Sequence, residues 1–226
     1  MTPAALPVDP AAVVDRVAGL RALIDERSPH PASVRVVAVT KGFGPDAVAA
    51  AVAAGLGEVG ENYADELVAK ATAAAEGGLA VRWHFLGAVQ RNKVARLAPL
   101  VSCWQGIARP EEGAAIARRR PGATVLVQVD LAGLPGRGGC DPSGVPGLVA
   151  ALRDDGLDVA GLMAVGPPGD PEDARPGFRR LVAAADELGL PVRSLGMTGD
   201  LAVALEEGST MVRVGRGLFG ERPPRP

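Results

Sequence analysis

Short runs of apolar, often β-branched residues alternate with helical patterns along almost the whole chain, and this alternation constrains the fold more than any other feature. Residues 34–39 form an apolar run interrupted only by Arg35, which predicts a strand buried on both faces. Pro45 then suits the first turn of a helix over residues 45–54. The same order, a strand and then a helix, repeats towards the end of the chain.

Eight strands are predicted in all, and a helix is predicted after each of them except the last. The strands are expected at residues 34–39, 56–59, 81–86, 100–104, 124–129, 159–165, 192–195 and 211–214. The helices are expected at residues 45–54, 62–75, 89–97, 111–120, 145–153, 176–188 and 201–207, with an opening helix at residues 10–26. Parallel strands joined by helices need both sheet faces covered, and eight such units close most naturally into a barrel. We therefore predict an α/β fold, a single (β/α)8 TIM-like barrel with an extra N-terminal helix; an open doubly wound sheet is the alternative.

The length of the chain fits one domain of this kind. It has 226 residues, and no composition shift marks a linker. We expect residues 1–226 to form a single domain, with its core at about residues 28–220 and a frayed, proline-rich tail at residues 221–226. No exposed apolar stripe stands out, so a monomer is the default expectation.

Charge and cysteine content exclude several classes of partner. The 24 basic and 26 acidic residues are scattered and give a formal charge of −2, so neither a nucleic-acid footprint nor a polybasic membrane patch is expected. The apolar stretch at residues 47–57 is too short to span a bilayer, and the N-terminus lacks the pattern of a signal peptide. Cys103 and Cys140 are the only cysteines and lie far apart, which favours a reducing compartment, the cytoplasm.

Lys41 directly follows the first predicted strand, at the end of the sheet where a barrel places its chemistry. Desolvation there disfavours the ammonium form, and a neutral amine can attack an aldehyde. On position alone, a solvated loop lysine is the commoner alternative. The other strand ends carry Glu61, Asn62, Gly87, Asp130 and the segments 163–166, 196–199 and 215–217.

Two glycine-bearing loops near the C-terminus are candidates for binding an anion. Thr198 and Gly199 lie between the seventh strand and the next helix, and Gly215, Arg216 and Gly217 follow the eighth strand. Glycine lets the backbone approach a ligand closely, and barrels frequently bind phosphate between the loops after strands seven and eight. Two ordinary glycine turns are the alternative, but together the loops favour a phosphate site.

Other chemistries find little support in the sequence. His30 and His84 are the only histidines, and no cysteine or carboxylate lies at ligand spacing from either, so no metal site is expected. There is also no GxSxG nucleophile elbow and no Walker-type loop. The residues by themselves thus indicate an imine-forming lysine that faces a phosphate pocket.

The motifs that carry these residues resemble those of the YggS/PROSC-type pyridoxal phosphate homeostasis proteins, over about residues 34–220. They are AVTK with Lys41, GENYADE at residues 60–66, WHFLGAVQRNK at 83–93, GLMAV at 161–165, LGMTGD at 195–200 and GSTMVRVGRGLFG at 208–220. Any one of them alone would be weak, but six in this order are highly specific.

The resemblance implies a fold-type III barrel, related to the amino-terminal domain of alanine racemase, that holds pyridoxal 5′-phosphate (PLP) as an imine on Lys41. The cofactor-binding residues that it implies are Lys41, Asn62, His84, Met163, Thr198, Gly199, Arg213, Gly215 and Arg216. Asn62 would lie near the cofactor ring and Arg213 would face the pyridine nitrogen. Thr198, Gly199, Gly215 and Arg216 would surround the phosphate. No residue is implied to be catalytic.

Two of these residues have open roles. Arg216 stands where the family commonly has a small hydroxyl residue, so it could bind phosphate through its side chain or through its backbone N–H alone. His84 alternates with Trp83 and Phe85 along its strand, so it could face the cofactor or be a satisfied core histidine. Thr198 replaces the usual serine, and its hydroxyl can do the same job.

The resemblance further implies a protein that buffers PLP or delivers it, possible recipients being PLP-dependent apoenzymes, with effects on amino-acid balance. An arginine at the ring nitrogen can only donate a hydrogen bond, which leaves the nitrogen unprotonated and makes the ring a weaker electron sink. Racemases of this fold also use a tyrosine from an added domain, which would begin where this chain ends; Tyr63 is the only tyrosine here. A weak amino-acid racemase or lyase is the first alternative, and an aldolase that forms an imine with a sugar phosphate is the second.

Overall fold

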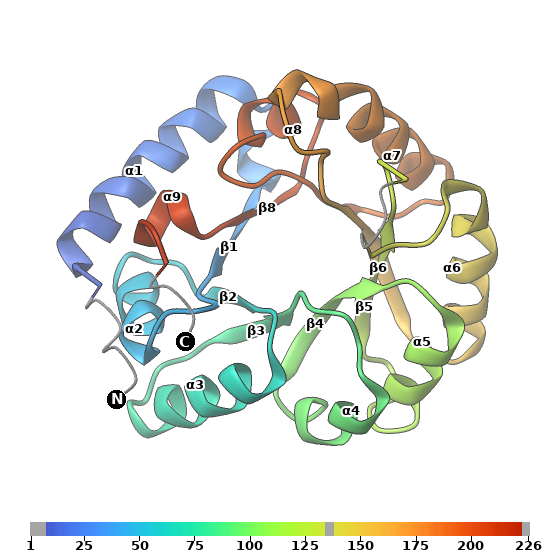
Figure 1. Ribbon diagram of the computed structural model, residues 1–226, viewed down its shortest axis with the longest axis horizontal. Coiled ribbons are helices and arrows are strands. Elements are labelled where there is room, and N and C mark those ends of the chain that lie inside the picture. Colours follow the sequence, from blue (N-terminus) through green and yellow to red (C-terminus); the bar gives the residue numbers. More distant parts are fainter. Residues whose placement is uncertain (1–7, 134–137, 223–226) are drawn as a thin grey trace.

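The eight strands form one closed parallel barrel, in the order in which they occur in the sequence. The computed structural model describes residues 8–133 and 138–222. Each strand pairs in parallel with the next, and β8 pairs with β1, so the sheet has no edge. Figure 1 shows the helices as a ring outside the strands. The predicted (β/α)8 barrel is confirmed, and the open doubly wound alternative is excluded.

The strands lie close to their expected positions. They are β1 (Arg35–Val39), β2 (Glu58–Glu61), β3 (Arg82–Phe85), β4 (Val101–Ile107), β5 (Thr124–Val129), β6 (Asp158–Ala164), β7 (Val192–Ser194) and β8 (Met211–Val214). β2 begins later than expected because Leu56 is buried in the preceding turn, where its N–H donates to the Ala51 carbonyl. β4 continues past Trp104 through an irregular register against β5, which brings Gln105 into the barrel wall.

Helices connect the strands and cover their outer faces. They are α1 (Pro10–Arg27), α2 (Pro45–Ala53), α3 (Ala64–Glu76), α4 (Arg91–Leu97), α5 (Pro110–Ala117), α6 (Val145–Asp154), α7 (Arg175–Glu187), α8 (Leu201–Glu206) and α9 (Arg216–Phe219), with 3-10 turns η1 (Pro31–Ser33), η2 (Pro142–Gly144) and η3 (Pro171–Ala174). The extra N-terminal helix α1 begins at Pro10, where the Asp9 carboxylate accepts a hydrogen bond from the Ala11 N–H. The single turn α9 is absent from the expected pattern, because four residues are too few to show helical periodicity.

Alternation along the strands divides the buried residues into two layers. In β8, Val212 packs outward against the helices, whereas Met211 and Arg213 point into the barrel. In β3, His84 points inward between two aromatic neighbours that pack outward. The described part of the chain contains no helix with both the length and the apolar character needed to cross a membrane.

The barrel is closed unequally around its circumference. β5 and β6 share six register pairs, whereas β7 and β8 share one, Ser194 with Met211. At this seam the buried Ser209 hydroxyl lies within hydrogen-bond distance of the carbonyl oxygens of Arg193, Leu195 and Met211, at 3.2, 2.8 and 3.1 Å. A side chain thus supplements the few backbone pairs that join these two short strands.

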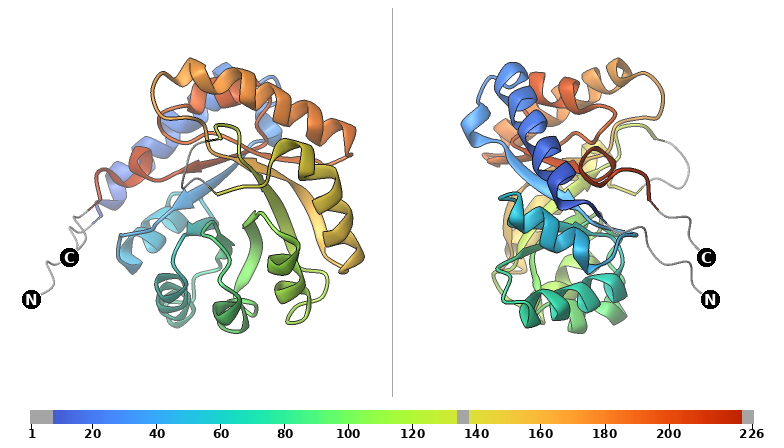
Figure 2. Two further views of the ribbon diagram at one scale, coloured as in Figure 1. Left: turned by 45° about the vertical axis from the view of Figure 1, so that its right-hand side comes forward. Right: turned by 90° about the vertical axis from the view of Figure 1, so that its left-hand side faces the viewer.

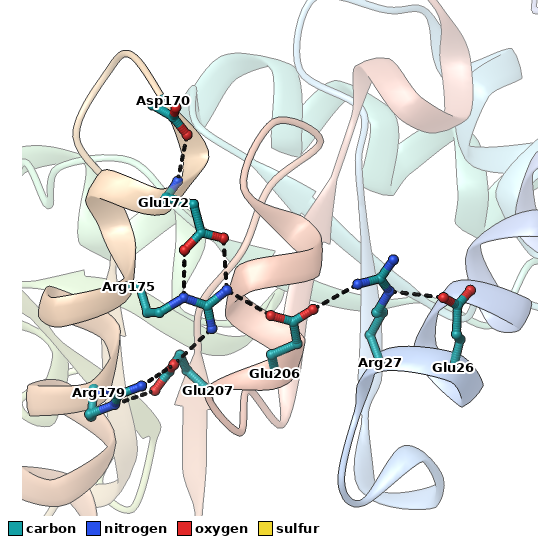
Figure 3. A network of polar contacts seen from close by, with 8 residues as sticks. All are labelled: Glu26, Arg27, Asp170, Glu172, Arg175, Arg179, Glu206 and Glu207. Carbon is teal, nitrogen blue, oxygen red and sulfur yellow. Dashed lines mark hydrogen bonds and ion pairs between the residues drawn. The ribbon is translucent and has the colours of Figure 1, made fainter.

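Surface ion pairs also connect the helices that cover this seam. Figures 1 and 2 show α1, α8 and α7 side by side on the outside of the barrel. Arg27 on α1 pairs with Glu206 on α8 at 2.9 Å, and Glu206 pairs with Arg175 on α7 at 2.7 Å (Figure 3). Glu207 pairs with Arg175 and Arg179 at 2.9 and 2.8 Å. We refer to these five residues as the surface network.

Candidate functional site

A cavity of about 560 Å³ opens at the carboxyl ends of the strands, where barrels hold their chemistry. Eight of the nine residues expected in the site line it: Lys41, Asn62, Met163, Thr198, Gly199, Arg213, Gly215 and Arg216. They come from the ends of β1, β2, β6, β7 and β8, so closure of the barrel brings together residues that are far apart in the sequence.

His84 is the expected site residue that does not line the cavity. It is completely buried inside the barrel, with Nδ1 2.7 Å from Gln105 Nε2. Of the two alternatives left open by the sequence, the structure supports the core histidine. The motif around His84 could not decide between the two alternatives, because strand alternation indicates only that His84 faces away from Trp83 and Phe85.

Lys41 lies on a turn whose backbone is held on both sides. Before it, the Thr40 carbonyl accepts a hydrogen bond from Lys70 Nζ at 2.8 Å; after it, the Gly42 N–H donates to Glu66 Oε2 at 2.8 Å. Gly42 has a φ of +79°, a conformation that favours glycine. The half-buried Lys41 therefore leaves the sheet from a fixed backbone at the wall of the cavity.

The side chains that hold this turn form a charged cluster around the buried Glu61 and Lys70, with the Glu66 side chain 29% exposed. Lys70 is 3% exposed and donates to Glu61 Oε1 at 2.6 Å and to Glu66 Oε2 at 3.1 Å. Thr40 Oγ1 donates to the same Glu61 oxygen at 2.6 Å. Burial raises the pKa of Glu61, although the Lys70 ammonium group acts in the opposite direction. We refer to Thr40, Glu61, Glu66 and Lys70 as the anchor cluster.

Arg213 reaches the cavity from inside the barrel. It is 5% exposed and donates to the Ser194 carbonyl at 2.5 Å, to the Ser194 hydroxyl at 2.6 Å and to the Ala164 carbonyl at 2.7 Å. Burial lowers the pKa of Arg213 to about 10, which still leaves the guanidinium charged at neutral pH. Arg213 can therefore donate hydrogen bonds to a ligand but can accept none.

The loops after β7 and β8 contact each other directly. The Gly217 N–H donates to Thr198 Oγ1 at 3.1 Å. Gly215 packs so closely against β1 that a Cβ there would lie 3.0 Å from the Val39 carbonyl oxygen. The Arg216 side chain is 60% exposed, and its guanidinium lies 4.0 Å from Glu221. The two loops thus form one continuous wall, with little room for a side chain at Gly215 or Gly217.

Several functional candidates had no clear sequence signal. Gln128 in β5 and Arg222 after α9 line the cavity but belong to none of the quoted motifs. Lys70 lies four residues after Glu66 on a helix, a spacing that usually indicates an exposed ion pair, yet it is buried. Within the described residues, no three His, Cys, Asp or Glu side chains gather closely enough to hold a metal ion.

Comparison with known proteins places this geometry in a family. The profile of the family described as "Alanine racemase, N-terminal domain" matches residues 8–223. The pyridoxal phosphate homeostasis protein of Pseudomonas aeruginosa is 36% identical over 200 residues, which cover 85% of this chain and 86% of that protein. The protein of the same name from Deinococcus radiodurans is 36% identical over 207 residues, 90% of this chain and 97% of that protein.

A solved structure agrees with these sequence relatives. PipY from Synechococcus elongatus PCC7942, in a structure described as having PLP bound, has a TM-score of 0.81 and 28% identity, with 92% of this chain and 100% of that chain covered. The similarity therefore extends over nearly the whole barrel and not only over its motifs. On this evidence the chain belongs to the pyridoxal phosphate homeostasis protein family, which shares the fold of the alanine racemase N-terminal domain.

Proposed function

We propose that this chain binds PLP in the cavity through Lys41 and takes part in PLP homeostasis, storing and delivering the cofactor without a dedicated reaction of its own. One observation carries the proposal: a lysine, a buried arginine and two glycine loops surround a single cavity. At about 560 Å³, that cavity is within the usual size range of cofactor sites. The names of the relatives and the PLP-bound PipY structure support the same ligand.

Lys41 supplies the amine for covalent attachment. Its nitrogen would add to the aldehyde carbon, and one water would leave as the C=N bond forms. Because the anchor cluster fixes the backbone before and after Lys41, the amine needs little reorganisation to reach a ligand.

The loops after β7 and β8 would hold the phosphate. The Thr198 hydroxyl and the backbone around Gly199 and Gly215 supply polar groups beside glycines that permit close approach. The Arg216 side chain is largely exposed and lies near Glu221, so we assign its backbone N–H, not its guanidinium, to the phosphate.

Arg213 would donate a hydrogen bond to the ring nitrogen. Since its guanidinium stays charged and cannot accept, the ring nitrogen would remain unprotonated. PLP supplies an electron sink when it is bound, and this arrangement weakens that sink.

The cavity favours a carrier over a racemase. Two-sided proton transfer at an amino acid needs a second base opposite the lysine. Among the described residues that line the cavity there is no histidine, tyrosine or cysteine, and Asp200, a carboxylate there, accepts a hydrogen bond from the Met197 N–H. Tyr63 is 41% exposed at the start of α3, outside this lining.

We further propose that the protein is a cytoplasmic monomer that passes PLP to apoenzymes. Cys103 and Cys140 are free thiols, as a reducing compartment allows. Large apolar side chains exposed in residues 8–133 and 138–222 are Val14, Tyr63 and Met197, which lie on separate elements and form no continuous patch. Sedimentation of the PLP-loaded protein should give the mass of one chain.

The proposed function is tested by adding PLP to the purified protein. A yellow visible band should appear and saturate at one PLP per chain. The loaded protein should show no sustained turnover of a panel of L- and D-amino acids followed by chiral chromatography. Sustained turnover would replace the carrier by a racemase or lyase, and a colourless protein that instead forms an imine with a sugar phosphate would replace it by an aldolase.

A further inference from the structure

Polar side chains cross the interior of the barrel, and of these the proposed PLP site uses Arg213. The others are Ser194 in β7, Gln105 in β4, His84 in β3 and Glu58 in β2. Ser194, Gln105 and His84 are 0% exposed. They are surrounded by an apolar interior that consists of Val37, Cys103, Leu126, Met163, Val192 and Met211. We refer to the five polar residues as the interior chain.

The donor and acceptor roles along the interior chain follow from its first member. A guanidinium has no lone pair to offer, so Arg213 donates to Ser194 Oγ, at 2.6 Å. The Ser194 hydroxyl then donates to Gln105 Oε1, at 2.7 Å. This places Gln105 Nε2 toward His84 Nδ1, 2.7 Å away, so the amide donates and the ring nitrogen accepts.

His84 is therefore neutral and carries its hydrogen on Nε2. Burial, together with the charges of Arg35 and Arg82, lowers the pKa of His84 to about 3. His84 Nε2 lies 3.5 Å from Glu58 Oε2, and neither atom has a hydrogen-bond partner among the described residues. The other Glu58 oxygen lies 3.5 Å from Arg35 and 3.7 Å from Arg82. The interior chain thus leads from a cation at the cavity to a carboxylate at the amino end of β2.

Filling the barrel would not require these polar groups. Buried polar atoms cost free energy unless they are paired, and apolar side chains of similar volume fill the same space without that cost. Cys103, on the same face of β4 two positions before Gln105, belongs to the apolar interior. Three hydrogen bonds of 2.6–2.7 Å link Arg213 to His84 through Ser194 and Gln105. They indicate that these side chains orient a group and do not merely fill space.

Gln105 controls which side of the Ser194 hydroxyl faces Arg213. Because the Ser194 hydroxyl donates its hydrogen bond to Gln105 Oε1, the lone pairs of Ser194 Oγ remain available to the Arg213 guanidinium. Without Gln105, the hydroxyl hydrogen could rotate toward another acceptor and Arg213 would lose a fixed partner. The remaining partners of Arg213 in the interior are backbone carbonyls of Ser194 and Ala164.

We propose that Gln105 is a positioning residue for Arg213. By accepting a hydrogen bond from the Ser194 hydroxyl, Gln105 holds the Arg213 guanidinium beside the place where the ring nitrogen of bound PLP would lie. The proposal rests on the proposed function, since it takes PLP as the ligand. It assigns an effect on the ring nitrogen to Gln105, which is not among the residues that line the cavity.

The test compares Gln105→Leu with Cys103→Ala, each loaded with PLP that carries ¹⁵N in its ring. Leucine keeps the volume of Gln105 but removes its hydrogen bonds to Ser194, His84 and the Met211 sulfur, whereas Cys103→Ala changes the same interior face outside the interior chain. Gln105→Leu should shift the ring-nitrogen resonance and raise the Kd for PLP about tenfold, the factor that corresponds to about 1.4 kcal/mol for one buried hydrogen bond. Cys103→Ala should leave the resonance and the Kd unchanged.

An unchanged resonance and an unchanged Kd in folded Gln105→Leu would overturn the proposal, while attachment at Lys41 in the same sample would leave the proposed function intact. Failure of the wild-type protein to bind PLP would instead defeat the proposed function, and this proposal with it. If circular dichroism shows that Gln105→Leu does not fold, Ser194→Ala decides by the same two readouts, because it removes the hydroxyl without adding volume. A shifted resonance with weaker binding supports the proposal, and wild-type values contradict it.

Discussion

The two ends of the proposed PLP site are held in place by different means. At Lys41, the turn after β1 is fixed by the anchor cluster, whose Glu61 and Lys70 are almost completely buried. At the loops after β7 and β8, these two strands share one register pair, and the surface network joins the helices outside them. Solvent and salt weaken exposed ion pairs far more than buried ones.

This difference shows how one barrel can combine a rigid attachment site at Lys41 with less tightly held loops after β7 and β8. The amine that would attach the cofactor belongs to the part of the barrel with a buried charged support. The loops that would hold the phosphate follow β7 and β8, among the shortest strands of the barrel. A protein that both keeps and releases a cofactor can use this asymmetry, because release would need water to cleave the imine on Lys41 and movement only of the less tightly held loops.

Removal of the Lys41 amine should have the largest effect. Lys41→Ala should abolish the visible band completely, because no other amine is found among the described residues of the cavity lining. The loops after β7 and β8 should still retain some PLP without colour, which equilibrium dialysis would detect. A full visible band in the variant would show that the anchor lies elsewhere.

Loss of the Lys70 charge should come next. Lys70→Met leaves Glu61 buried without its cation, so the free energy of unfolding should fall by about 3–5 kcal/mol in urea titrations. Lys93→Met is the matched control, since Lys93 is 31% exposed and lies 3.7 Å from Asp65 at the surface. The double variant Lys70→Met/Glu61→Gln should be more stable than Lys70→Met, and an equally unstable double variant would contradict the buried pairing.

The two regions should respond to pH with opposite sign. Burial raises the pKa of Glu61 above its ordinary value of 4.5, so its contribution to stability is present below that value and is lost as the pH rises through the folded pKa. Hydrogen bonds from Arg175 and Arg27 lower the pKa of Glu206, so its contribution is lost as the pH falls through the folded pKa. The signs are opposite because the folded state binds the Glu61 proton more tightly than the unfolded state does, whereas the unfolded state binds the Glu206 proton more tightly.

Two variants separate these contributions. In the wild type, Glu61 should make the free energy of unfolding decrease as the pH rises above 4.5, and Glu61→Gln should reduce this decrease. Glu206 should make it decrease as the pH falls below 4.5, and Glu206→Gln should reduce that decrease. Urea titrations at closely spaced pH values measure both slopes. Changes of the same sign in the two variants would remove the contrast between the buried and the exposed region.

The surface network should give the smallest effect. Arg175→Gln breaks ion pairs to Glu172, Glu206 and Glu207; the Glu172 and Glu206 side chains are 60% and 30% exposed to water, and that of Glu207 is 8% exposed. The variant should lower the Tm slightly, and the difference from the wild type should shrink in about 0.5 M NaCl because salt screens exposed charges. Arg153→Gln on α6, outside the surface network, is the control. A loss of Tm that salt leaves unchanged would indicate that Arg175 acts through packing.

The fold could be predicted from the sequence because strand and helix signals alternate in a fixed order. A parallel sheet with eight such units has few other ways to cover both faces, so modest errors at the strand ends did not change the result. β2 was misplaced because Leu56 looks like a strand residue but is buried in a turn. α9 was missed because a single turn has no periodicity to read.

The cavity residues could be predicted because a barrel gathers the carboxyl ends of its strands at one face. Lys41 and the loops after β7 and β8 followed from that rule, and Arg213 followed from the family motifs. The side chains that hold the cavity residues in place could not be predicted, because their hydrogen-bond partners lie across the barrel. Gln105 and Ser194, for example, are 89 positions apart in the sequence. Lys70 was equally hidden, since its spacing from Glu66 is that of an ordinary surface ion pair.

Borohydride reduction of the PLP-loaded protein, followed by peptide mass mapping, shows whether the cofactor is attached to Lys41. The chain has three lysines, Lys41, Lys70 and Lys93, so the site of attachment can be assigned without ambiguity. We expect the added mass of reduced PLP on the peptide that contains Lys41 and on no other. Attachment at Lys70 or Lys93, or no attachment in a protein that still binds PLP, would contradict this expectation.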